Sequence, residues 1–313
     1  MNKDILIAVG AGALSAVAAL TFQTGAPGGL LFAYFAPLPL MLVGLSLGAM
    51  SGTVSAIAGI VTSAALGGLM ASTLFTVLHA FPAWFVARQA LLKRTAPDGT
   101  VSWYPLGTAI SLLALMAAFM FTMVALAEWQ SAEGLQQALA KRLDHSISLW
   151  FPTLAEAQRA AFVELFTAIL PALIAMSWLL MTVINGVIAQ AILVKIGKNL
   201  RPRPEYSALT LPDWLSWAIV AAACSALLGS GKIEYMGRTL VVILAVPFFM
   251  LGLAVVHRLA RHVAFPGLLL AAVYFSIFLS LWAALVVATV GILEQWLGLR
   301  RRLPLQGPNQ ESE

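Results

Sequence analysis

Charged residues are scarce in this chain of 313 residues. Asp, Glu, Lys and Arg together make up 10% of it, whereas hydrophobic residues make up 61%. A soluble domain averages about a quarter charged residues, so this composition excludes an ordinary water-soluble fold. The few charges lie almost entirely between long uncharged apolar stretches. This pattern is typical of a protein that crosses a membrane many times.

Cysteine and the known catalytic motifs are also missing or nearly so. Cys224 is the only cysteine, which excludes an intramolecular disulfide and a cysteine-based metal cage. The sequence has no P-loop, no His-Glu-x-x-His zinc motif, no Gly-x-Ser-x-Gly nucleophile motif and no pair of Asp residues inside an apolar stretch. We therefore predict no catalytic residue, no metal site and no cofactor, and we expect that the protein is not an enzyme.

The chain contains nine apolar stretches, and they predict an all-α, polytopic transmembrane bundle. A helix needs about 20 apolar residues to cross roughly 30 Å of hydrocarbon. The stretches cover residues 5–23, 29–48, 51–68, 70–92, 103–126, 162–194, 214–229, 240–256 and 263–293. The last would reach roughly 46 Å as one helix, so it requires either a steep tilt or a tight hairpin near residues 280–283. We predict nine spans in the first case and ten in the second.

The distribution of Lys and Arg favours the hairpin. Basic residues concentrate in the cytoplasmic loops of membrane proteins. With a cytoplasmic N-terminus and ten spans, 13 of the 18 basic residues lie inside, Arg300, Arg301 and Arg302 among them. We therefore predict that both termini are cytoplasmic and that the protein resides in the bacterial inner membrane. This topology accounts for the net charge of +5, so we expect contact with anionic membrane lipid and no binding of nucleic acid.

Polar segments divide the chain into parts. We predict a six-helix transmembrane core at residues 1–200, C-terminal transmembrane helices at 201–298 and a disordered cytoplasmic tail at 299–313. The longest polar insertion, residues 128–161, carries Leu135, Leu139 and Leu143 at steps of four, which places them on one face of a helix. We expect an amphipathic helix on the outer surface, acting either as a lid or as a passive surface element.

Polar side chains inside the fourth and sixth spans are the candidate ligand site. An ionisable residue within the hydrocarbon is costly and marks a functional hypothesis, and His79 lies nine residues into the fourth span. Thr76, three residues earlier, shares the helix face of His79. In the sixth span, Trp178, Thr182 and Asn185 lie at i, i+4 and i+7, so they also share one face. Together they could line a small-molecule cavity, with Trp178 stacking on the ligand and His79 and Asn185 forming directional hydrogen bonds. Ordinary interhelical hydrogen bonding is the alternative.

Small residues mark one face of the first span. Ala11, Ser15 and Ala19 repeat every four residues, and such a face allows another helix to approach closely. The partner is either another helix of this chain or a separate membrane subunit, and the sequence leaves both open.

Several Pro- and Gly-rich segments carry a family resemblance. They are Pro37–Gly48 (PLPLMLVGLSLG), Phe81-Pro82-Ala83, Pro247–Leu253 (PFFMLGL) and Gly291–Arg302 (GILEQWLGLRRR). Together they resemble the YybS-like bacterial membrane proteins, a family of unknown function, over nearly the whole chain. That family in turn resembles the substrate-capture subunits of energy-coupling-factor vitamin transporters. In those six-helix subunits, small residues of the first helix dock a transmembrane coupling subunit, and Ala11, Ser15 and Ala19 match that pattern with one serine. This chain carries about four further spans and the outer insertion.

Two functions follow from these observations. The first is binding or transport of a small molecule, through a cavity between spans four and six, with a membrane coupling subunit as partner. The second is a non-transporting scaffold, or an envelope-biogenesis protein, that acts through helix–helix contacts and has no cavity. A lone histidine and a few amides do not identify the ligand.

Overall fold

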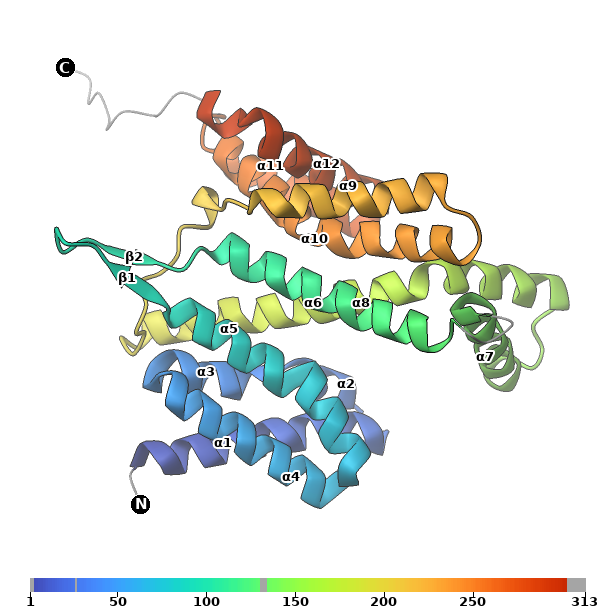
Figure 1. The fold of residues 1–313 in the computed structure, drawn as a ribbon, viewed down its shortest axis with the longest axis horizontal. Coiled ribbons are helices and arrows are strands. Elements are labelled where there is room, and N and C mark those ends of the chain that lie inside the picture. Colours follow the sequence, from blue (N-terminus) through green and yellow to red (C-terminus); the bar gives the residue numbers. More distant parts are fainter. Residues whose placement is uncertain (1–2, 26, 130–133, 303–313) are drawn as a thin grey trace. The chain divides into compact units, whose positions relative to one another are not determined.

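A computed structural model describes residues 3–25, 27–129 and 134–302 (Figure 1). Within these ranges the chain is mostly helical, which confirms the all-α prediction. The helices are α1 (Lys3–Leu20), α2 (Gly29–Tyr34), α3 (Pro37–Leu47), α4 (Ala49–Phe75), α5 (Phe81–Leu91), α6 (Leu106–Ala127), α7 (Gly134–Trp150), α8 (Glu156–Lys195), α9 (Asp213–Leu228), α10 (Lys232–Ala260), α11 (Pro266–Leu279) and α12 (Leu281–Leu297). One short antiparallel hairpin, which the sequence did not predict, pairs β1 (Lys93–Thr95) with β2 (Val101–Trp103).

Four short turns of other helix types complete the described chain. Three are 3-10 helices, and the segment Thr76–Ala80 between α4 and α5 is a π-helix. They are η1 (Thr21–Thr24), η2 (Thr76–Ala80), η3 (Tyr206–Ala208) and η4 (Leu299–Arg302). A π-helical turn inside a longer helix often marks a functional site, and this one contains His79 and Thr76.

Six helical segments of the described chain are long and apolar enough to cross a membrane. They are Lys3–Thr24, Gly29–Leu47, Ala49–Leu91, Leu106–Ala127, Glu156–Lys195 and Lys232–Ala260. Three apolar helices are shorter, namely α9, α11 and α12. The predicted polytopic transmembrane architecture is thereby confirmed, while the total of nine or ten spans and the orientation of the termini stay predictions.

The 43-residue segment Ala49–Leu91 is a helical hairpin. At Gly68 the backbone leaves the helical region, with φ 76° and ψ −175°, a conformation that glycine adopts readily. The Ser72 hydroxyl donates to the Ile60 carbonyl at 3.0 Å, although these residues would lie about 18 Å apart along one straight helix. The chain therefore reverses at Gly68, where the sequence predicted the boundary between the third and fourth spans.

A second break lies at Ser280, inside the predicted hairpin segment. Its φ of −145° and ψ of 125° are those of extended backbone, and they separate α11 from α12. Arg258 near the end of α10 and Arg300 just after α12 line the same pocket, so α10 and α12 end on the same side. Because α11 connects them, it runs in the opposite direction, and the chain reverses at Ser280.

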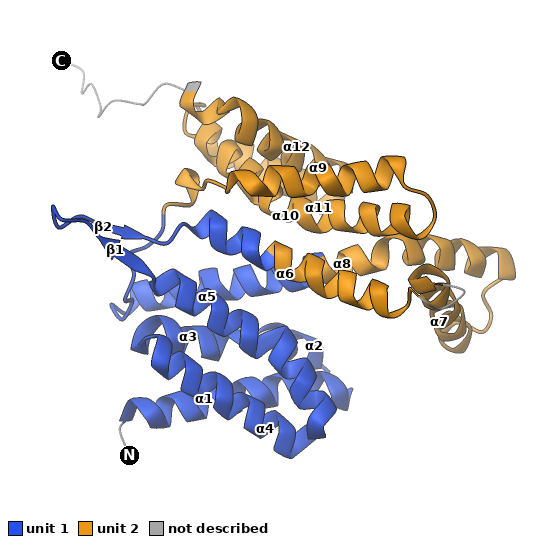
Figure 2. Ribbon diagram, viewed as in Figure 1, with its two compact units in different colours: residues 1–113, 176–204 blue, residues 114–175, 205–313 orange. Residues whose placement is uncertain are grey.

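The chain forms two compact units (Figure 2). Unit 1 comprises residues 1–113 and 176–204, and unit 2 comprises residues 114–175 and 205–313. Helices α6 and α8 are each divided between the two units. The core of unit 1 is formed by α1, α3, α4, α5 and α8, whose buried side chains pack together as a cluster that includes Leu40, Met41 and Phe75.

The polar insertion contains a helix, as predicted, whereas the start of the predicted disordered tail is ordered. The expected helix in the insertion is α7, with Leu135, Leu139 and Leu143 half-buried along one face. Disorder was predicted from residue 299, but Leu299–Arg302 forms a 3-10 turn, because Arg300 is held by several hydrogen bonds described below. The remainder of the predicted tail, 303–313, lies outside the described residues.

Candidate functional site

The polar residues predicted from spans four and six lie on neighbouring segments of unit 1, which one hydrogen bond joins. The indole N–H of Trp178 in α8 donates to the Leu78 carbonyl at 3.0 Å, so α8 contacts the π-helical turn. The amide of Asn185 donates to the Tyr34 carbonyl at 2.8 Å. The Tyr34 hydroxyl in turn lies 2.9 Å from the Ser177 carbonyl. Hydrogen bonds thus connect α8 to α2 and to the π-helical turn.

These side chains are buried and mostly bonded to backbone carbonyls. Thr182 and Asn185 are fully buried, and His79 and Trp178 are 9% and 7% exposed. The hydroxyls of Thr182 and Thr76 donate to carbonyls of their own helices, at 2.9 and 2.7 Å. The Asn185 amide also donates to the Met181 carbonyl of its own helix, at 2.8 Å. Backbone carbonyls therefore account for the donors of Trp178 and Asn185.

Two buried polar atoms in this cluster have no partner within the described part of the chain. They are Nδ1 of His79 and Oδ1 of Asn185. An unpaired buried polar atom is costly, so these two atoms are where a bound molecule would form hydrogen bonds. The predicted ligand-binding role of the five residues stays a prediction.

The small-residue face of α1 is used inside unit 1. The hydroxyl of Ser15 is fully buried and donates to the Ala36 carbonyl at 2.5 Å. The neighbouring Gly12 approaches α4 so closely that a Cβ there would lie 2.1 Å from the Ser55 carbonyl oxygen. Ala11 and Ala19 are half-buried. Docking of a separate subunit on Ala11, Ser15 and Ala19 stays a prediction, with Ser15 already occupied by this chain.

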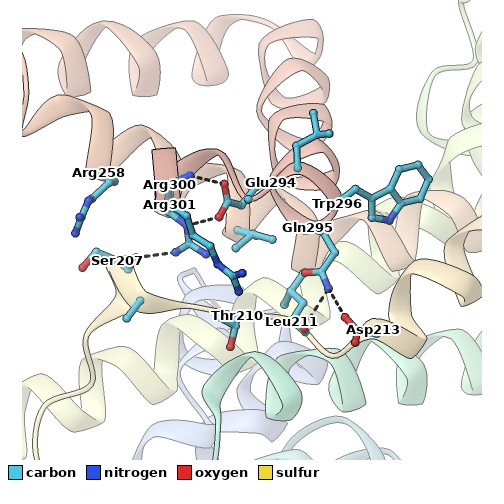
Figure 3. Close-up of a pocket in the computed structure, with 14 residues that line it drawn as sticks. Ser207, Thr210, Leu211, Asp213, Arg258, Glu294, Gln295, Trp296, Arg300 and Arg301 are labelled. Carbon is cyan, nitrogen blue, oxygen red and sulfur yellow. Dashed lines mark hydrogen bonds and ion pairs between the residues drawn. The ribbon is translucent and has the colours of Figure 1, made fainter. Parts of the chain in front are cut away.

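Unit 2 contains a large pocket that the sequence did not predict (Figure 3). Its volume is about 880 Å³, within the range of small-molecule sites. It lies where α9 begins and α10 and α12 end, and the loop before α9 closes one side. Its lining residues are Ser207, Ala208, Thr210, Leu211, Asp213, Leu251, Arg258, Glu294, Gln295, Trp296, Leu297, Gly298, Arg300 and Arg301.

An ion pair builds the pocket wall. Gly298 takes a left-handed conformation, with φ 59°, which ends α12 and turns the chain back. The Arg300 Nε and backbone N–H then donate to the two carboxylate oxygens of Glu294, at 2.8 and 2.9 Å. The terminal nitrogens of Arg300 donate to the carbonyls of Ser207 and Leu209, at 2.7 and 2.6 Å. Arg300 therefore fastens the loop before α9 onto the end of α12.

The charged side chains of the pocket are unevenly distributed. Figure 3 shows Arg258, Arg300 and Arg301 on one side, and Asp213, Gln295 and Trp296 on the other. Asp213 accepts a hydrogen bond of 3.2 Å from Gln295. Since Arg300 is paired with Glu294, Arg258 and Arg301 are the lining cations outside that pair. Nε of Arg258 is buried and has no partner among the described residues.

Sequence reasoning placed the pocket residues in other roles. No role in a site was predicted for Glu294, yet its side chain is 6% exposed and paired with Arg300. Arg300 and Arg301 were interpreted only as markers of the cytoplasmic side. The signal that could have found the site is Glu294 followed by Gly298 and Arg300, because a glycine just after a helix allows the chain to fold back onto its last turn.

No group of three or more His, Cys, Asp or Glu side chains suited to a metal ion occurs in the described ranges.

The comparisons with known proteins give one family. No curated protein matches the chain, and no solved structure matches it. A family model described as "Predicted membrane protein (DUF2232)" matches residues 13–294, and the chain therefore belongs to this family of uncharacterised multi-span membrane proteins.

Proposed function

We propose that this membrane protein binds an anionic small molecule in the arginine-lined pocket of unit 2. One observation carries the proposal: the pocket of about 880 Å³ is lined by three arginines, one of which, Arg258, has a buried Nε without a partner in the described chain. A buried donor of a charged group costs free energy until an acceptor reaches it. An anion in the pocket would supply that acceptor.

The lining chemistry suits a phosphate or carboxylate group. Guanidinium groups form charge-assisted, often bidentate hydrogen bonds with such oxyanions, and Arg258 and Arg301 are placed to do so. Glu294 would oppose an anion, but its charge is compensated by Arg300 at 2.8 Å. The side chains of Thr210 and Gln295 line the same space and offer neutral hydrogen-bonding groups that would orient the ligand.

Thermal unfolding of the detergent-purified protein tests this proposal. Inorganic phosphate and pyrophosphate serve as probes, against sodium chloride at matched ionic strength. A ligand at 100 times its dissociation constant should add about 2.7 kcal/mol to stability. Arg258→Gln and Arg301→Gln should abolish the shift. Arg238→Gln is the control, because Arg238 pairs with Glu234 in α10 and does not line the pocket. Equal shifts in all three variants would contradict the proposal.

A second candidate is the ligand site around His79, and its supporting observation is the pair of unpartnered atoms on His79 and Asn185. In that case the protein would capture or transport a small molecule, with a coupling subunit as partner. A panel of vitamins, nucleobases and lipid precursors tests it by the same unfolding assay. Stabilisation that His79→Ala and Trp178→Ala both remove supports this site. If no compound stabilises the protein, the non-transporting scaffold in the inner membrane becomes the better interpretation.

A further inference from the structure

An apolar groove continues the pocket of unit 2 along α9. Its volume is about 520 Å³, and it shares Asp213, Gln295 and Trp296 with the arginine-lined pocket. The other lining residues, Ser216, Trp217 and Val220, lie on α9. With Asp213 they are spaced at i, i+3, i+4 and i+7, so one face of α9 forms the groove. The pocket and the groove are therefore adjacent, and together they offer a charged part and an apolar part.

Two exposed tryptophans line the groove. Trp217 and Trp296 are 75% and 63% exposed, and both lie close to helix ends, as tryptophan does at membrane interfaces. Arg258 and Arg301 lie in the charged part. Residue 220 lies two turns into α9, toward its apolar middle. This order suits an apolar part in the hydrocarbon and arginines toward the water.

Unpartnered polar atoms occur in both parts of this site. Nε of Arg258 belongs to the charged part, and the hydroxyl of Ser216 belongs to the apolar part. The residue Ser216 is 8% exposed, and its Oγ has no partner within the described ranges. Water is scarce inside the hydrocarbon region, so a polar atom there depends on a partner from protein or ligand. A ligand with an anionic end and a weaker polar group behind it would satisfy both atoms.

We propose that the ligand is a lipid with a phosphate headgroup, which enters the site from the bilayer. The phosphate lies against Arg258 and Arg301, the ester or hydroxyl groups of the lipid lie near Ser216, and an acyl chain follows the groove between α9 and α12. This proposal rests on the proposed function, since it assigns the class of anion. Basic pockets between transmembrane helices are known sites for anionic lipid headgroups. The groove gives the reason for a lipid over a soluble phosphate, because only a lipid fills both parts.

Two probes separate the lipid from its headgroup. Glycerol 3-phosphate carries the charged end alone, and dihexanoyl phosphatidic acid carries the same end with two short chains. Binding of both to the detergent-purified protein is measured by isothermal titration calorimetry, with dihexanoyl phosphatidylcholine as the zwitterionic reference. Each buried methylene should tighten binding about fourfold, so phosphatidic acid should bind at least tenfold more tightly than glycerol 3-phosphate. Arg301→Gln should weaken both probes by about tenfold or more.

Groove variants decide whether the chains bind where we propose. Trp217→Ala and Val220→Ser should remove the advantage of phosphatidic acid and leave glycerol 3-phosphate unchanged. Trp282→Ala is the matched control, because Trp282 is 77% exposed, close to the 75% of Trp217, and does not line the groove. Equal affinity of the two phosphate probes would overturn the lipid assignment and leave anion binding standing. Binding of neither probe would overturn both proposals.

Discussion

At the scale of single residues, the ion pair of Arg300 and Glu294 is the most consequential contact in unit 2. Both side chains are largely buried, at 13% and 6% exposed, and Arg300 also donates to two carbonyls of the loop before α9. Removing one partner of a buried pair leaves an uncompensated charge, which costs about 3–5 kcal/mol. Arg300→Met should therefore lower the free energy of unfolding by about that amount, measured by thermal or urea unfolding in detergent.

The partner substitution separates lost charge from lost packing. Glu294→Gln in the Arg300→Met background removes the unpaired carboxylate, so the double variant should be more stable than Arg300→Met alone. Arg238→Gln removes an exposed pair on α10, whose arginine side chain is 71% exposed, and should change stability by less than about 1 kcal/mol. A double variant no more stable than Arg300→Met would show that the loop contacts, and not the buried charge, dominate.

Individual site residues were only partly predictable from the sequence. The polar positions His79, Trp178 and Asn185 stood out because an apolar helix seldom carries them, and the structure places Trp178 against the π-helical turn that contains His79. Glu294 did not stand out, because its partner Arg300 follows a helix end, and the other contacts of Arg300 are with a loop some 90 residues earlier in the chain. Such tertiary partners have no periodic signal, so spacing rules miss them.

At the scale of elements, the contact between α10 and α12 depends on two glycines. A Cβ at Gly252 would lie 1.9 Å from the Val287 carbonyl oxygen, and one at Gly291 would lie 1.8 Å from that of Phe248. These oxygens belong to backbone, so the helices themselves would have to separate. Overpacking typically costs about 1–3 kcal/mol, and we expect Gly252→Ala or Gly291→Ala to destabilise unit 2 by at least that much in thermal unfolding.

A glycine in the adjacent helix provides the control for this prediction. A Cβ at Gly267 in α11 meets no atom within 4 Å. Gly267→Ala should therefore be neutral or slightly stabilising, since alanine is the better helix former. If all three alanine variants unfold at the same temperature, the close approach of α10 and α12 contributes nothing to stability.

Element boundaries were predicted best where a local rule applied. The reversal at Ser280 was predicted from the length of the stretch 263–293, which exceeds one crossing of about 30 Å, together with the distribution of Lys and Arg. The reversal at Gly68 lies between two stretches that were each predicted as a span. The β1–β2 hairpin was missed, since each strand has three residues and three residues are too few for a recognisable alternation. The groove along α9 was missed as well, because in a membrane helix an apolar face gives no sign of which side packs and which side remains open.

At the scale of the whole molecule, the sequence predicts ten spans with both termini in the cytoplasm, and the reversal at Ser280 is the feature that separates ten spans from nine. Single cysteines in a Cys224→Ser background, labelled in intact cells with a membrane-impermeant maleimide, test this topology. With ten spans, cysteines replacing Ser230 and Ser280 should react from outside, and one replacing Asp98 should react only after lysis. An unreactive position 280 beside a reactive position 230 would place the turn at Ser280 within the membrane, and α11 and α12 would then form a re-entrant hairpin instead of two crossings, with Arg300 still on the side of Arg258.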